Sequence, residues 1–156
     1  MFEAMLVPGG RIGPAAFRNA YLVLIAIGVG IQLVPLVWPS LLIGFLGLVM
    51  LYPSAVLWVK RFHDAGKSGW WFLAVFAATI AAGLAANHFI IERFAPAIIP
   101  GSSAAEVFAQ AAARMQAVAI PSAIVSTVIS LAFVFIINEE LKSDPNENQY
   151  GPPPPR

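Results

Sequence analysis

The residues most able to do chemistry lie together in one short segment, KRFHDAGKSGWW, at positions 60–71. Its Gly66-Lys67-Ser68 triplet matches the last part of a phosphate-binding P-loop. That motif needs an earlier glycine, and this chain has Arg61 at that position. The motif also follows a β-strand, and the long apolar segment before residue 60 does not predict one. A nucleotide-phosphate site is therefore disfavoured.

His63 and Asp64 form the second chemical candidate in this segment. A histidine beside a carboxylate can exchange protons with a lipid phosphate as acid and base. The same pair also occurs in metal sites, but those sites need further ligands. His88, the only other histidine, is predicted at the far end of the next apolar segment. A metal site within one chain is therefore disfavoured, and no cofactor is expected.

Basic and aromatic side chains give the segment a third use. Basic residues near an anionic lipid surface contribute about 1 kcal/mol each, and tryptophans favour the membrane interface. Gly66 and Gly69 permit a chain reversal between two membrane spans. We therefore predict a tight turn at the membrane surface. The residues expected to contact lipid or a protein partner are Lys60, Arg61, His63, Asp64, Lys67, Trp70 and Trp71.

The composition identifies the elements that must position this turn. Of the 156 residues, 59% are hydrophobic and only 11% are charged, which is too few charges for a soluble domain. A formal net charge of +1 gives little attraction for nucleic acid. The chain has no cysteine, so disulfides and thiolate chemistry are excluded. The class is an integral membrane protein with one compact domain at 1–142.

The distribution of charges predicts four membrane-spanning helices. No acidic or basic residue occurs from Asn19 to Val59, and one helix of that length would be roughly 60 Å long, twice the ~30 Å hydrocarbon core. The chain must turn back, and Pro35 and Pro39 mark the turn. Pro53 is expected to kink the second span. The predicted spans are about 19–36, 41–59, 70–91 and 118–138.

Lys and Arg counts near the span ends predict the orientation. With four spans, seven basic residues fall on the side of the termini and two, Arg93 and Arg114, on the other side. Both termini are therefore expected in the cytoplasm. The seven are Arg11, Arg18, Lys60, Arg61, Lys67, Lys142 and Arg156.

The segments outside the spans carry weaker patterns. Ser103 and Glu106 match a capping box, which predicts a short extra helix in the outer loop between spans 3 and 4. That helix either lies in the interface or continues into span 4 with a bend at Pro121. Residues 143–156 are polar and rich in proline, and we expect a solvated, extended cytoplasmic tail.

Three pieces of the sequence together resemble one family. Residues 61–71 resemble the central motif of the small bacterial inner-membrane proteins grouped as domain of unknown function 805. Gly10-Arg11-Ile12 with Phe17 resembles the entry motif of that family, and residues 148–152 resemble its Asn-x-Tyr-Gly-Pro tail. The resemblance implies a multi-pass protein of the bacterial inner membrane, and it implies no established activity.

Three classes of function follow. The leading interpretation is a non-enzymatic structural or regulatory membrane protein whose basic turn contacts anionic lipid or a partner. The alternatives are a small oligomeric channel or transporter and, less favoured, a lipid-phosphate enzyme using His63 and Asp64. The predicted spans carry no charged group at mid-depth, which disfavours ion-coupled transport. The expected partners are membrane lipids and a second copy or another membrane protein, and not nucleic acid.

Overall fold

The computed structural model describes residues 6–40, 43–100 and 103–155, and within these ranges the regular elements are all helices. Four helical stretches are long and apolar enough to cross a membrane. This confirms the predicted all-α class with four spans. The elements are α2 (Pro14–Leu33), η1 (Val34–Leu36), α3 (Ile43–Val49), α4 (Leu51–Asp64), η2 (Gly69–Trp71), α5 (Phe72–Phe94) and α6 (Ala104–Glu140).

The first span begins earlier than predicted and turns where predicted. Pro14 is the first residue of α2, a position at which the missing N–H of proline costs nothing. The helix ends at Leu33, and the 3₁₀ turn η1 contains the buried Pro35. The proline cannot continue the α-helical hydrogen bonds, so the chain leaves the helix there.

The second span is broken by its proline, as predicted, but it is longer than predicted. A proline ring clashes with the carbonyl four residues earlier, which for Pro53 is that of Val49. The last residue of α3 is Val49, and α4 begins two residues later. The helix continues past the predicted span end near residue 59, because α4 ends at Asp64. The first part of the predicted surface turn, residues 60–64, is therefore helical.

The third and fourth spans begin at side-chain caps. Ser68 accepts a hydrogen bond from the Trp70 N–H at the start of η2, which leads into α5. Ser103 and Glu106 form the predicted capping box at the start of α6. Of the two alternatives predicted for the helix that starts there, the structure shows the second, because α6 runs on through Pro121 to Glu140 as one helix.

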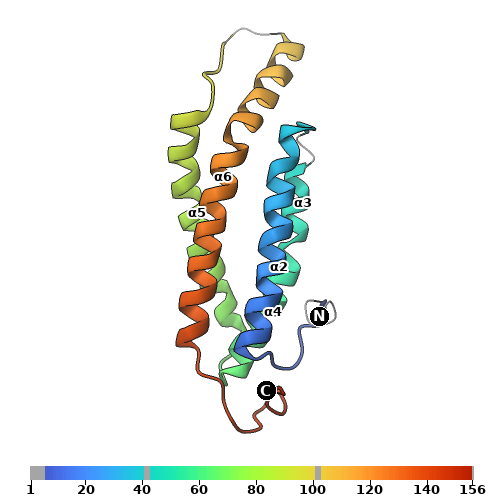
Figure 1. The fold of residues 1–156 in the computed structure, drawn as a ribbon, viewed down its shortest axis with the longest axis vertical. Helices are drawn as coiled ribbons and strands as arrows, with labels where there is room; N and C mark the ends of the chain where they lie inside the picture. Colours follow the sequence, from blue (N-terminus) through green and yellow to red (C-terminus); the bar gives the residue numbers. More distant parts are fainter. Residues whose placement is uncertain (1–5, 41–42, 101–102, 156) are drawn as a thin grey trace.

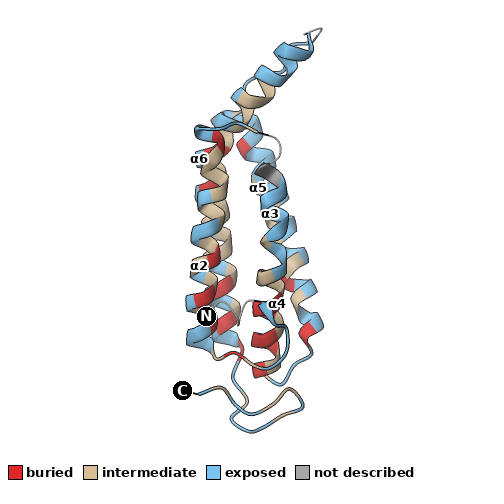
Figure 2. Cartoon of the chain, turned by 90° about the vertical axis from the view of Figure 1, so that its right-hand side faces the viewer, coloured by how far each residue is buried: buried red, intermediate tan, exposed pale blue. Residues whose placement is uncertain are grey.

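Buried residues concentrate at one end of the bundle. Figure 1 shows the described N-terminal residues and the C-terminal segment at this same end, which we call the base. Most of the red residues of Figure 2 gather there, and a few lie toward the opposite end, where pale blue and tan residues predominate. Helix α6 packs against both α2 and α5, and α4 packs against α2. The exposed helix surface is rich in large apolar side chains, which suits a lipid surround.

The core of the base is aromatic. Phe17 and Tyr21 of α2 meet Trp58 and Phe62 of α4, with ring centroids 4.7 to 5.9 Å apart. Offset and tilted rings at these distances attract one another beyond their area of burial. This cluster holds α4 against α2 directly above the charged end of α4.

Candidate functional site

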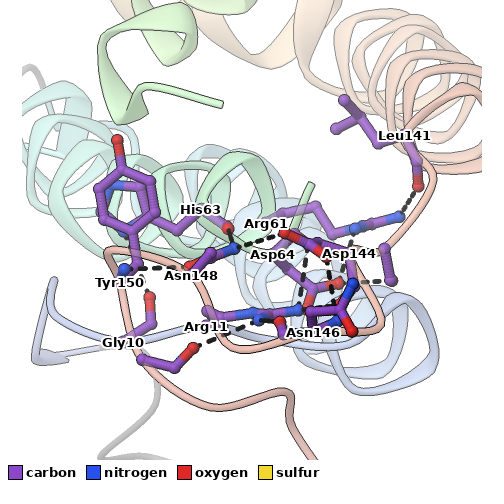
Figure 3. Close-up of polar contacts among 12 residues, drawn as sticks. Gly10, Arg11, Arg61, His63, Asp64, Leu141, Asp144, Asn146, Asn148 and Tyr150 are labelled. Atoms are coloured by element: carbon purple, nitrogen blue, oxygen red, sulfur yellow. Dashed lines mark hydrogen bonds and ion pairs between the residues drawn. The ribbon is translucent and has the colours of Figure 1, made fainter. Parts of the chain in front are cut away.

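Asp64 is the centre of the polar site at the base. It is the last residue of α4, and it is 0% exposed. Its Oδ1 accepts hydrogen bonds from Arg11 Nε (3.2 Å) and Nη2 (3.1 Å). Its Oδ2 accepts from Arg61 Nη1 (3.0 Å) and from the Ser143 hydroxyl (2.5 Å). A carboxylate has about four lone-pair positions, so the acceptor capacity of Asp64 is filled (Figure 3).

Arg61 links α4 to the end of α6. It lies one turn before Asp64, is 1% exposed, and donates from Nε to Asn138 Oδ1 at 2.6 Å. Its Nη2 donates to the backbone carbonyls of Asn138 (3.1 Å) and Leu141. Carbonyls at the end of a helix lack intrahelical partners and carry the negative end of the helix dipole. The guanidinium therefore caps α6 as well as pairing with Asp64.

Arg11 links the N-terminal segment to the tail. Its side chain is 1% exposed. Besides the carboxylate of Asp64, its guanidinium reaches the backbone carbonyls of Asp144, Asn146 (2.7 Å) and Gly151 (3.3 Å). Arg11, Arg61 and Asp64, which we call the Arg–Asp junction, thus join segments up to 140 residues apart in sequence.

Several residues of the tail contact the base, while most of the described tail residues remain exposed to solvent. The Asp144 N–H donates to the Asp64 carbonyl (2.8 Å), and Asn148 Nδ2 donates to the His63 carbonyl (3.1 Å). The ring of Tyr150 stacks on that of His63, with centroids 3.7 Å apart and planes within 4°. These contacts were not predicted, and they form because donors and acceptors of α4 and the N-terminal segment find their partners in the tail.

His63 faces away from Asp64, so the two do not form an acid–base pair. Its Nδ1 lies 3.2 Å from the Gly10 carbonyl, and its ring is stacked on Tyr150. His63 lines a hollow of about 380 Å³ together with Val59, Ser68, Gly69, Trp70, Phe72 and Tyr150. Within the described ranges, no group of three or more metal-ligating side chains comes together.

The Gly66-Lys67-Ser68 triplet ends a helix and does not form a phosphate loop. The Lys67 N–H donates to the Phe62 carbonyl (2.9 Å), and the Gly66 N–H donates to the His63 carbonyl (3.1 Å). Gly66 has a φ of +67°, the left-handed conformation that glycine adopts most readily. These two bonds and this conformation make a Schellman C-cap on α4.

The structure divides the seven residues predicted to contact lipid or a partner. Trp70 (74% exposed), Trp71 (57% exposed) and Lys67 are at the surface. Arg61 and Asp64 are buried in the Arg–Asp junction and cannot reach lipid headgroups, which corrects the expectation for those two. Lys60 is 9% exposed, and His63 is half-buried under Tyr150.

Several residues of the site were not among the predicted contacts. They come from the N-terminal segment, the end of α6 and the tail, and they are Arg11, Asn138, Ser143, Asp144, Asn148 and Tyr150. Asn138 carried one available signal, because it is an amide at the end of an otherwise apolar run. The glycine at position 66 carried another, since it marks the true end of α4.

Comparison with known proteins gives a family match that contains all three pieces of the sequence that lie at the base. Searches of the curated proteins and of the solved structures each found no match. The family described as "Protein of unknown function (DUF805)" matches residues 10–152, which includes Arg11, the whole central segment and the tail to Pro152. The chain belongs to the DUF805 family.

Proposed function

We propose that this chain is a non-enzymatic protein of the bacterial inner membrane whose base rests on anionic lipid headgroups. Exposed Lys67, Trp70 and Trp71 supply the contact, and the buried Arg–Asp junction holds them in place. A lysine beside two interfacial tryptophans suits the boundary between headgroups and water. Both termini then lie in the cytoplasm, on the side with more basic residues.

The saturation of Asp64 is the observation that carries the non-enzymatic assignment. A general base needs a free lone pair within reach of the proton that it removes. Both oxygens of Asp64 already accept two hydrogen bonds each, and the residue is fully buried. The ring of His63 is held by Gly10 and Tyr150 instead. This arrangement supports a structural role for both residues.

A charge-swap series at Lys67 tests the lipid contact. Lys67→Gln removes the charge, and Lys67→Arg retains it as the matched control. The measurement is the thermal unfolding of the purified protein in neutral detergent, with added phosphatidylglycerol or phosphatidylcholine. We expect phosphatidylglycerol to stabilise the unchanged protein and Lys67→Arg, and Lys67→Gln to lose about 1 kcal/mol of that stabilisation. An equal gain in all three proteins would overturn the proposal.

Reporter fusions after Arg156 test the orientation separately. A reporter that folds only in the cytoplasm should be active, and a phosphatase that works only in the periplasm should be silent. The opposite pair of results would place the base on the outer side and remove the anionic inner leaflet as its partner.

A further inference from the structure

Polar side chains from three spans line one cavity above the aromatic cluster. The cavity has a volume of about 180 Å³ and lies between α2, α4 and α6. Tyr21 and Gln32 mark its extent along α2, and the eleven helical steps between them, at ~1.5 Å each, span about 16 Å, half of a ~30 Å hydrocarbon core. Its polar lining is Tyr21, Gln32, Ser54, Ser126, Thr127 and Ser130.

Hydrogen bonds between helices join part of this lining. The hydroxyls of Tyr21 and Ser54 lie 2.6 Å apart, and Trp58 Nε1 donates to the Tyr21 oxygen at 3.2 Å. At the other end of the cavity, the Ser126 hydroxyl donates to Gln32 Oε1 at 3.0 Å. These contacts orient polar groups from α2, α4 and α6 toward a shared space.

The lining also has hydrogen-bonding capacity that the described residues do not use. Ser130 Oγ has no hydrogen bond to any described residue. The Gln32 amide nitrogen has two N–H groups and makes one long bond, 3.4 Å, to the Gly28 carbonyl. A hydroxyl or amide left without a partner in hydrocarbon costs several kcal/mol. Water molecules within the cavity would satisfy both groups.

The cavity has no charged group in its lining. Its lining carries hydroxyl, amide and apolar groups and no ionisable acid or base other than the Tyr21 phenol. Such a lining offers hydrogen bonds to small neutral molecules and offers nothing to offset the desolvation of an ion.

We propose that this cavity is a hydrated binding site within the membrane, which holds water through Ser54, Ser126, Ser130 and Gln32. A space of this volume holds several water molecules.

Single cysteines test the hydration directly, since the chain has none of its own. Ser126→Cys and Ser130→Cys place a thiol in the cavity with almost no change of volume. Val128→Cys is the matched control: it lies within one turn of both on α6, and Val128 is 60% exposed on an apolar groove. The reagent is neutral, water-soluble 2-hydroxyethyl methanethiosulfonate, applied to the full chain in liposomes. Labelling after SDS denaturation confirms that each thiol is present.

The expected result is faster labelling inside the cavity than on the lipid face. A thiol reacts as its thiolate, which forms in water and not in hydrocarbon, so Cys at 126 and 130 should label at least about tenfold faster than Cys at 128. Labelling at 126 and 130 no faster than at 128 would overturn the proposal, and would assign the cavity to a lipid chain or to a second copy.

Discussion

Arg11, Arg61 and Asp64 put two positive charges and one negative charge in a buried place. One carboxylate cannot neutralise two guanidinium groups, so backbone carbonyls must accept the remaining N–H groups. Carbonyls from the tail and from the end of α6 do so. No buried side-chain nitrogen or oxygen among the described residues is left without a partner. Buried charges are tolerated under this condition, and removing one partner is costly.

Gly69 is a second residue that the base requires, for a steric reason. A Cβ at this position would lie 2.8 Å from Val59 Cγ1 and 2.9 Å from His63 Nε2. Gly69→Ala must therefore displace the His63 ring, which is already stacked on Tyr150. We expect a loss of about 1–3 kcal/mol in the free energy of unfolding, the usual cost of overpacking, measured by thermal unfolding in detergent.

Gly83→Ala is the matched control for Gly69→Ala. Gly83 lies on α5, where an added Cβ would meet nothing within 4 Å. Alanine is the better helix former by about 1 kcal/mol, so this variant should unfold at the same temperature or higher. A Gly69→Ala protein as stable as Gly83→Ala would show that η2, which begins at Gly69, can move away from His63 at little cost.

Among the elements, α6 depends most clearly on a side chain from elsewhere. Arg61 supplies the hydrogen bonds that the carbonyls of Asn138 and Leu141 lack. Arg61→Met keeps an unbranched side chain but leaves those carbonyls and Asp64 Oδ2 short of a donor. We expect faster hydrogen exchange in residues 134–141, at the end of α6. We also expect a loss of about 3–5 kcal/mol in the free energy of unfolding, because the substitution breaks the buried Arg61–Asp64 pair.

Lys142→Met is the control for Arg61→Met. Lys142 is an exposed cation beside the same helix end, so its loss should leave exchange in α6 unchanged. Equal exchange in both variants would mean that the end of α6 is held by packing alone.

The sequence predicts the helices well where a local rule decides them. The charge-free windows give the four spans, Pro53 gives the break between α3 and α4, and Ser103 with Glu106 gives the start of α6. The end of α4 was misplaced because charged residues after Val59 were assigned to water. Burial of Arg61 and Asp64 became favourable only through partners from other segments, which no local pattern contains.

The same reasoning explains why the site was predicted only in part. The central segment was recognised as important from its own residues, but the contacts that define its role join residues 53 to 85 positions apart in the sequence. A polar tail is predicted to be exposed, because its own sequence does not show that buried donors elsewhere in the chain hydrogen-bond to its carbonyls. Arg11 and the His63 carbonyl region supply those donors and acceptors, so the tail became part of the base.

For the whole molecule, the base is the part that fixes how the four spans are joined. The buried residues of α2 and α4 concentrate there together with Val134 and Asn138 of α6, and the N-terminal segment and the tail meet there. Farther along, the helices expose apolar surface suited to lipid. The Arg–Asp junction should therefore contribute more to stability than any exposed charge on the chain.

A double-mutant cycle on Arg11 and Asp64 tests this most directly. Arg11→Ala, Asp64→Ala and the double variant are unfolded by SDS titration from mixed micelles, with Glu147→Ala as an exposed acidic control. We expect a coupling energy of about 1–3 kcal/mol, so that the double variant is little worse than Asp64→Ala alone. Strictly additive losses, or losses as small as the ~0.5 kcal/mol typical of surface substitutions, would show that the Arg–Asp junction does not stabilise the base.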